Sequence, residues 1–421
     1  MLPPGPSAPP AIQTARWLLR PISFMSECRR RYGEAFSVRF LGFTTPMVML
    51  SDPAAIRTLY TERRHGLPPG RGVALLPVVG PRSVLLLEGS EHLARRKLML
   101  PPFHGARMRA YETTVREVVA REVARWPRDE PFALHPRMQA ITLEVILRAV
   151  FGVTDSADRA RLAERLGQLL AQTSSPGLQF GVLLSRRLGG PDPLARLEAL
   201  RNEIDALLAA EVAARRAEPG EDILSLLIAA RFEDGEPMDD AEIRDQLMTL
   251  LLAGHETTAT GLAWTFDLLL RHPHVLQKLG NGDDDAYLRA VVAESLRLRP
   301  VVPLAGRRLS AELRLNGHVL PPGTDVTPAI WLAHTRPDRY PEPYAFRPER
   351  FVEDAPATYA WIPFGGGVRR CIGAAFAEME MRVALSEIVR RRALRPASST
   401  AEKVARRNVT FSPARGTMVI A

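Results

Sequence analysis

Phe364-Gly-Gly-Gly-Val-Arg-Arg-Cys371-Ile-Gly373 is the stretch of this 421-residue sequence that decides the fold, and a helical run from Ala374 to Val389 follows it. The stretch places one cysteine beside a glycine-rich turn and just before a helix start, where backbone N–H groups and the helix dipole favour a negative charge. Glycine permits positive φ and lets the backbone pass close to a flat, bulky ligand. Cys371 is therefore a candidate thiolate, as a nucleophile or a metal ligand, and the alternative is a buried structural cysteine.

Composition indicates a globular protein, since 46% of the residues are apolar and no uncharged apolar run reaches the length of a membrane span. The net charge is +9, yet only three lysines occur (Lys97, Lys278 and Lys403), and the arginines alternate with acids along the chain. A dense basic tail with interleaved aromatics, as nucleic-acid binding would favour, is missing from this pattern. We therefore expect no nucleic acid and an acidic protein as the charged partner.

The two cysteines, Cys28 and Cys371, cannot make a disulfide framework, which fits a reducing compartment. Cys28 stands on a charged helical face and is expected to be an ordinary thiol. The proline-rich N-terminus lacks the pattern of a secretion signal. We expect a cytoplasmic monomer without a membrane anchor, with a flexible segment over residues 1–12 and one domain over residues 13–421.

Local patterns predict short strands near the N-terminus and a largely helical middle of the chain. Residues 66–81 form an apolar loop that either roofs a pocket or folds on the surface. Asn316-Gly317 predicts a tight hairpin, and a second hairpin is expected at residues 409–413. The expected strands are 35–40 and 46–50, the helices include 53–61, the stretch 110–230 is mostly helical, and loops interrupt it at 174–177 and 189–193.

A helix of about thirty residues, some 45 Å long, is predicted from Ala241 to His272. Its small residues Gly254, Thr257 and Gly261 share one face with Leu250 and would leave a groove with a hydroxyl along it. The alternative is close helix packing at the glycines, with Glu256 on a solvated face. A zinc-protease motif is excluded, because the residue four positions after His255 is alanine.

Two further pairs are ordinary when taken alone. His92 and Arg96 lie four residues apart on a predicted helix, as on any basic helix face. Glu294 and Arg297 could be a surface ion pair. A later Pro348-Glu-Arg350-Phe351 segment precedes the cysteine stretch.

Together these patterns resemble the cytochrome P450 family. The spacing Phe-x-x-Gly-x-Arg-x-Cys-x-Gly of residues 364–373 is similar to its haem-binding signature, and Ala253-Gly-His-Glu-Thr257 is similar to its oxygen-activation motif. Glu294-x-x-Arg297 with Arg350 resembles its buried ion-pair network. The resemblance implies a mainly α-helical cytochrome P450 fold with a small β region and a long central helix over the haem.

The resemblance also implies a role for each matching residue. Cys371 would be the axial ligand of haem b iron, and Glu256 with Thr257 would deliver protons to oxygen. The remaining cofactor-binding candidates are His92, Arg96, Arg307, Phe364, Gly367, Arg369 and Gly373. The expected substrate pocket is lined by Leu76, Leu250, Gly254, Val302, Leu304 and Phe411, and the structural network consists of Glu294, Arg297 and Arg350.

The activity implied is that of a soluble bacterial monooxygenase that hydroxylates or epoxidises a hydrophobic small molecule, such as a terpenoid, steroid or fatty acyl compound. It would consume O₂ and take two electrons from a separate acidic ferredoxin with its reductase, docked near Arg370 and Lys97. A haem-thiolate isomerase or dehydratase that consumes no O₂ is the alternative. A haem-based gas sensor is a non-enzyme alternative, which would normally carry an output domain.

Overall fold

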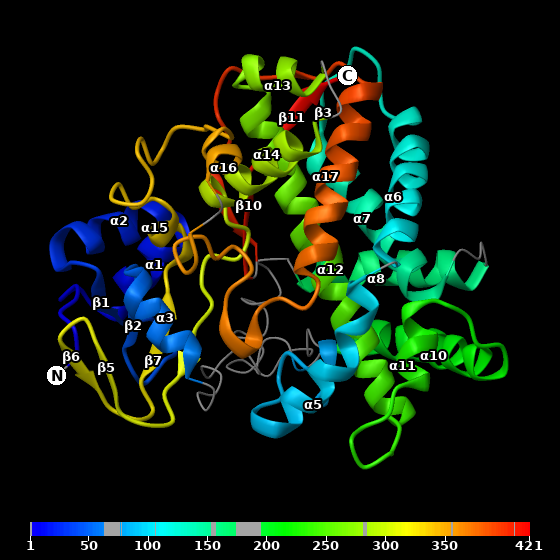
Figure 1. The fold of residues 1–421 in the computed structure, drawn as a ribbon, viewed down its shortest axis with the longest axis horizontal. Helices are drawn as coiled ribbons and strands as arrows, with labels where there is room; N and C mark the ends of the chain where they lie inside the picture. Colours follow the sequence, from blue (N-terminus) through cyan, green and yellow to red (C-terminus); the bar gives the residue numbers. More distant parts are fainter. Residues whose placement is uncertain are drawn as a thin grey trace. The chain divides into compact units, whose positions relative to one another are not determined.

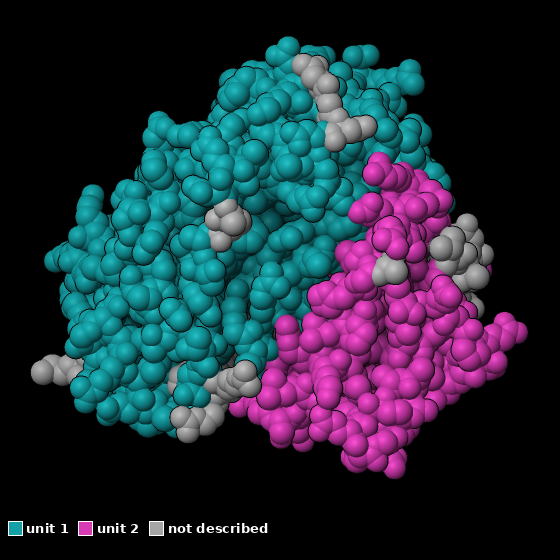
Figure 2. Space-filling model, in the orientation of Figure 1, with its two compact units in different colours: residues 1–70, 119–138, 257–421 teal, residues 71–118, 139–256 magenta. Residues whose placement is uncertain are grey.

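The computed structural model divides the chain into two compact units that interleave along the sequence. Unit 1 comprises residues 1–70, 119–138 and 257–421, and unit 2 comprises residues 71–118 and 139–256 (Figure 2, teal and magenta). Within residues 13–421, where the sequence predicts one domain, the chain thus passes between the units four times. The structure describes the chain except residues 1, 63–75, 77, 106, 153–156, 174–194, 281–283, 355–356 and 408.

Unit 1 holds every strand of the described part of the chain. The main sheet has the order β1-β2-β7-β4, in which β2 pairs antiparallel with β1 and parallel with β7 (Figure 1). The β-branched and aliphatic residues of these strands alternate into a buried cluster that includes Val48, Leu50 and Val326. The strands of this sheet are β1 (Ala35–Val38), β2 (Met47–Leu50), β4 (Arg307–Arg308) and β7 (Asp325–Pro328).

Three smaller sheets complete the β region, and two of them contain the predicted hairpins. Asn316 and Gly317 both have positive φ, 49° and 76°, as the tight turn between β5 and β6 requires. The predicted hairpin near the C-terminus is the antiparallel pair β9 and β10. The strands are β3 (Phe132–Ala133), β5 (Leu313–Leu315), β6 (His318–Leu320), β8 (Arg395–Pro396), β9 (Val404–Arg407), β10 (Thr410–Pro413) and β11 (Met418–Ile420).

Two helices of unit 1 begin at aspartate N-caps. Asp52 and Asp284 accept hydrogen bonds from the first turns of α3 and α14. α14 packs against α16 and α17, which places the ion-pair motif beside the helix that follows Cys371 (Figure 1). The helices are α1 (Pro10–Leu19), α2 (Pro21–Tyr32), α3 (Pro53–Thr61), α13 (Pro273–Gly280), α14 (Asp285–Leu298), α15 (Ile330–His334), α16 (Arg350–Glu353), the 3₁₀ turn η2 (Gly367–Arg369) and α17 (Ala374–Arg391).

The N-terminal segment, whose flexibility stays a prediction, makes hydrogen bonds with β1 and α1. The backbone N–H of Ser37 in β1 donates to the Pro4 carbonyl at 2.9 Å, and Gln13 donates to the Pro6 and Ala8 carbonyls. Helix α1 already begins at Pro10. The segment is held because proline carbonyls remain good acceptors, which composition alone did not reveal.

The regular elements described in unit 2 are all helices, as the patterning of residues 110–230 predicted. The expected loop at 66–81 lies mostly outside the described residues, as do the expected breaks at 174–177 and 189–193. Its own helices are α5 (Gly89–Met99), η1 (Pro101–Phe103), α8 (Ala157–Thr173), α10 (Ala195–Ala217) and α11 (Ile223–Ala229). No helix in the described residues is both long and apolar enough to cross a membrane.

Three helices contribute to both units: α6 (Arg107–Ala124), α7 (Leu134–Phe151) and α12 (Asp240–Leu269). The 30-residue α12 confirms the long helix predicted from Ala241 to His272. The predicted glycine groove on this helix stays a prediction, and the packing at its two glycines is close. A Cβ on Gly254 would lie 3.2 Å from Ile146 within unit 2, and one on Gly261 would lie 3.1 Å from Met381 within unit 1. At these two points the glycines serve close packing, the alternative weighed above.

Candidate active site

The cysteine loop of unit 1, residues 364–373, is closed by its own backbone. The N–H of Cys371 donates to the Phe364 carbonyl at 3.0 Å, and Gly365 and Gly367 adopt φ of 68° and 65°. A Cβ on Gly367 would stand 2.2 Å from the Tyr60 carbonyl oxygen, so only glycine fits there. Cys371 is exposed and lies three residues before α17 begins. The loop therefore presents a sulfur to a ligand at a helix start.

Arg307 is buried and contacts the same loop. Its guanidinium donates to the Gly366 carbonyl at 2.9 Å and lies over the Tyr60 ring, 5.0 Å from the centroid. Tyr60 in turn donates to the Ala305 carbonyl at 3.1 Å. Arg369, in η2, is half-buried two residues before Cys371. The structure thus brings Arg307, Arg369 and the cysteine loop together in unit 1, with Tyr60 as a support that sequence reasoning missed.

Glu294, Arg297 and Arg350 form the network that the motifs predicted. Arg297 pairs with Glu294 at 2.6 Å, and both side chains are fully buried. Arg350 reaches the other oxygen of Glu294 at 3.1 Å. The Arg297 guanidinium also donates to the carbonyls of His334, Pro343 and Ala345, so that all of its N–H groups are used. A buried charge paired in this way is tolerated where an unpaired one would not be.

His334 links this network to Ile362, two residues before the cysteine loop, and sequence reasoning missed it. Its Nε2 accepts the Ile362 N–H at 2.7 Å, and its Nδ1 lies 3.1 Å from the Arg297 carbonyl, which can only accept. The ring is therefore neutral, with the proton on Nδ1. Burial first, and then the Arg297 charge, lower the pKa of His334 to about 3. No sequence pattern around this lone histidine signals the role.

In unit 2, α5 carries His92 and Arg96. His92 is buried and Arg96 is half-buried, one turn apart on the same helix. Their neighbour Arg95 pairs with Glu242 at 2.6 Å, which ties α5 to the start of α12. On α5, Arg95 thus makes an ion pair within unit 2, whereas His92 and Arg96 are the two residues that match the family pattern.

Residues 253–257, which resemble the oxygen-activation motif, lie in the middle of α12. Glu256 is half-buried, and its carboxylate accepts a hydrogen bond from the Gln139 side chain at 2.6 Å, so it is not simply on a solvated face. Thr257, the next residue, is also half-buried. His255 is buried, and burial lowers its pKa to about 4. The carboxylate is therefore held by an amide from α7 that no motif indicated.

The predicted pocket residues lie in different surroundings. Leu250 is 9% exposed and Leu76 is 44% exposed, both in unit 2. In unit 1, Val302 is half-buried and Leu304 forms an isolated β-bridge with Ala329. Phe411 is buried and lines a cavity that contains none of the other predicted pocket residues.

A haem fits the donor set of unit 1. The described residues contain no group of three or more His, Cys, Asp or Glu side chains that could hold a metal ion. An iron bound by Cys371 alone would need its other ligands from a macrocycle. Gly366 and Gly367 let Tyr60 pack against the loop, whereas a Cβ on Gly373, two residues after the sulfur, would meet nothing within 4 Å. The protein is thus mainly helical, with one cysteine at a helix start as the candidate metal ligand. The same unit contains the buried network of Glu294, Arg297 and Arg350.

Comparison with known proteins identifies that class. The family model described as Cytochrome P450 matches residues 3–419. A Mycobacterium tuberculosis protein provisionally named cytochrome P450 135B1 is 41% identical over 99% of this chain and 91% of its own length. Another from that organism, provisionally named cytochrome P450 137, is 38% identical over 99% of this chain and 90% of its own length.

Solved structures show the same fold. The structure titled "Retinoic acid bound cyanobacterial CYP120A1" has a TM-score of 0.85 at 24% identity, and covers 100% of this chain and 98% of that chain. The chain belongs to the cytochrome P450 family. It is a haem-thiolate monooxygenase, and such enzymes need O₂ and a redox partner. The predicted mainly α fold with a small β region is confirmed.

Proposed function

We propose that Cys371 is the thiolate ligand of haem b. The support is elimination: Cys28 is buried in an apolar cluster, not on the charged face that we expected, and burial raises its pKa to about 11. Cys371 is the exposed cysteine. The haem, when bound, supplies the iron that activates O₂, and thiolate sulfur favours O–O cleavage. Cys371→Ala should abolish the red-shifted Soret band of the reduced CO form, and Cys28→Ala should keep it. Retention of the band by Cys371→Ala would remove the assignment.

His92, Arg96, Arg307 and Arg369 would bind the two haem propionates by charge-assisted hydrogen bonds. The burial of His92, and that of Arg307 beside the cysteine loop, support this assignment. Arg96→Gln should lower haem retention during gel filtration, whereas Arg95→Gln, one residue earlier, should lower stability without selective loss of haem. Equal haem loss in both variants would contradict the assignment.

Glu256 and Thr257 would hold and transfer the protons that let one oxygen atom leave as water. A carboxylate fixed by Gln139 and a neighbouring hydroxyl are suited to this task, because each can hold a proton at a fixed oxygen. Thr257→Ala should divert electrons to hydrogen peroxide while NAD(P)H consumption continues. Thr258→Ala, a buried neighbour, is the matched control. Unchanged coupling in Thr257→Ala would exclude the relay.

The substrate would be a hydrophobic small molecule, hydroxylated or epoxidised by the enzyme. The apolar side chains Leu250, Val302 and Leu304 suit a terpenoid, steroid or fatty acyl compound. A screen of such compounds for the haem spin-state change should find binders, and product should form with matching consumption of O₂ and reductant. Product formation without O₂ consumption would favour the isomerase or dehydratase alternative.

The electron donor would be an acidic ferredoxin, in the cytoplasm and with a monomeric enzyme. Arg370 is exposed next to Cys371, whereas Lys97 already pairs with Glu233 at 2.9 Å. Arg370→Glu should therefore slow electron transfer and weaken its salt dependence. Arg314→Glu, on an arginine whose side chain is 82% exposed in the β5/β6 hairpin, should leave both unchanged. Equal effects of the two reversals would argue against docking at Arg370.

A further inference from the structure

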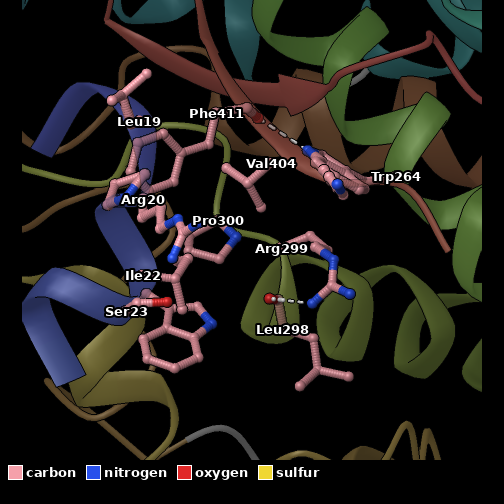
Figure 3. A pocket seen from close by; sticks show the side chains of 13 residues that line it. Leu19, Arg20, Ile22, Ser23, Trp264, Leu298, Arg299, Pro300, Val404 and Phe411 are labelled. Carbon is pink, nitrogen blue, oxygen red and sulfur yellow. Dashed lines mark hydrogen bonds between the residues drawn. The ribbon is translucent and has the colours of Figure 1, made fainter. Parts of the chain in front are cut away.

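A cavity of about 350 Å³ lies within unit 1, and the catalytic motifs do not account for it. It is bounded by the junction of α1 and α2, the end of α14, one residue of α12 and the strands β9 and β10 (Figure 3). At ~30 Å³ for each water, the space would hold roughly a dozen waters, which suits a ligand of about a dozen non-hydrogen atoms. The lining residues are Leu19, Arg20, Pro21, Ile22, Ser23, Trp264, Leu298, Arg299, Pro300, Trp331, Lys403, Val404 and Phe411.

The charges on the lining have one sign. Arg20, Arg299 and Lys403 are cationic, and no aspartate or glutamate lines the cavity. Among the described residues, none of the three forms an ion pair. By contrast, Arg95, Arg244, Arg308 and Arg382 each pair with an aspartate or glutamate. The cavity lining is thus cationic and includes no acidic side chain.

Arg299 is the deepest of these cations. Its guanidinium lies 5.2 Å from the Trp264 ring centroid, and its Nη1 donates to the Leu298 carbonyl at 3.1 Å (Figure 3). Its Nε–H is buried without a hydrogen-bond partner in the described structure. Burial lowers the pKa of Arg299, although the nearby Asp267 opposes this. Asp267 itself pairs with Arg271 at 3.1 Å. A buried donor left unbonded is costly, so an acceptor from outside the chain would be stabilised here.

The start of α2 adds to the positive potential. Pro21, Ile22 and Ser23 form its first turn, and the N-cap residue Arg20 makes no side-chain cap. First-turn N–H groups have no acceptor within a helix, and the dipole favours an anion beside them. This 12-residue helix therefore supports the same ligand charge as Arg299 does.

The remaining walls are aromatic and aliphatic. Trp264 is fixed because its Nε1–H donates to the Phe411 carbonyl at 2.8 Å. Trp331, Phe411 and Val404 complete an apolar wall, and Leu19 at the rim is 78% exposed. Such a lining would take an apolar ring or chain that carries one charged end.

We propose that this cavity is a second ligand site that binds an amphipathic organic anion, an aryl or short acyl carboxylate. Its carboxylate would accept hydrogen bonds from Arg299 and face Arg20, Lys403 and the first turn of α2. Its ring or chain would pack on Trp264, Trp331 and Phe411. This proposal is independent of the roles assigned to Glu256, Thr257 and the propionate ligands.

The test uses the full haem-loaded protein with 4-phenylbutanoate and its neutral amide, 4-phenylbutanamide, followed by calorimetry. A bulky azole that ligates the iron is added first, and its shift of the Soret band shows that the haem pocket is filled. The acid should still bind, about tenfold or more tighter than the amide, because charge-assisted hydrogen bonds are lost with the amide. Added salt should weaken the binding of the acid and leave the binding of the amide unchanged.

Variants locate the site. Arg299→Gln should weaken binding of the acid about tenfold and leave the amide unchanged. The double variant Arg20→Gln/Lys403→Gln alters exposed side chains only, so it decides the question if Arg299→Gln does not fold. This double variant should weaken the binding of the acid a few-fold, and the control variant Arg314→Gln should leave it unchanged. Loss of acid binding under the azole, equal affinity of acid and amide, no binding of the acid, or unchanged affinity in the cation variants would each overturn the proposal.

Discussion

Arg297 and Arg299 stand two residues apart at the end of α14, and their surroundings are opposite. Arg297 pairs with Glu294 and donates to three backbone carbonyls, so every N–H group has an acceptor. Arg299 donates to the carbonyl of the preceding residue, stacks on Trp264 and keeps a buried Nε–H without a partner in the described residues. The comparison shows that burial alone does not tell whether an arginine has a structural role or is available to a ligand. The acceptors that the fold provides separate a structural arginine from one available to a ligand.

The largest expected effect comes from removing the satisfied arginine. Arg297→Met leaves Glu294 as a buried carboxylate with Arg350 as its remaining cationic partner among the described residues, and removing one partner of a buried pair costs about 3–5 kcal/mol. Urea denaturation should show this loss of unfolding free energy, with loss of haem at lower urea than in the parent. A loss below about 1 kcal/mol would mean that the network is dispensable, as expected of a surface pair.

The histidine that joins the network to Ile362 should produce a pH dependence. Since the pKa of His334 is lowered to about 3, the unfolded chain takes up its proton near pH 6.5 and the folded chain does not. Its contribution is full above pH 6.5 and is lost as the pH falls towards 3, by an amount on the order of a few kcal/mol. His334→Gln, which can keep both hydrogen bonds, should flatten this part of the stability profile. His318→Gln in β6 is the control, and a profile unchanged in His334→Gln would contradict the assignment.

Arg350 tests how far the network extends. It bonds to Glu294 at 3.1 Å and to the Pro341 carbonyl, but its Nη2 has no hydrogen-bond partner in the described structure. Because Arg297 still neutralises Glu294, Arg350→Met should cost only about 1–3 kcal/mol. The same denaturation series measures it, and a cost equal to that of Arg297→Met would show that the three charges act as one unit.

Arg299 should show the smallest effect on stability. Arg299→Gln loses a cation–π contact of about 1 kcal/mol but also removes an unpaired, partly desolvated charge, so the two effects nearly cancel. We expect a change within about 1 kcal/mol in urea, alongside the loss of anion affinity described above. A destabilisation as large as that of Arg297→Met would place Arg299 among the structural arginines and end the comparison.

The sequence could predict Arg297 but not Arg299, for a physical reason. The Glu-x-x-Arg spacing puts two opposite charges on neighbouring turns of one helix, so their contact is local. The long α12 and the Asn316-Gly317 hairpin are also local, and both are confirmed. The surroundings of Arg299 depend on α2, α12 and β9, which come from distant parts of the chain, and no spacing rule reaches across them.

The same limit explains what was missed around the cysteine loop. The three glycines indicate that something passes close to the loop, but they do not say that it is Tyr60. His334 and Gln139 gained their roles from a backbone N–H and a carboxylate more than twenty residues away, which single-residue propensities cannot show. Likewise, the contact of the proline-rich start with β1 joins residues far apart in the sequence, which composition does not show.

The parallel pairing of β2 with β7 has a consequence for biosynthesis. Met47 lies opposite Asp325, so β2 gains its second neighbour only when most of the polypeptide has left the ribosome. Until then one edge of a hydrophobic strand that contains Val48 and Leu50 is open to other nascent chains. Fragments that stop before Asp325 should therefore aggregate, and slow translation of the second half should increase the demand for chaperones.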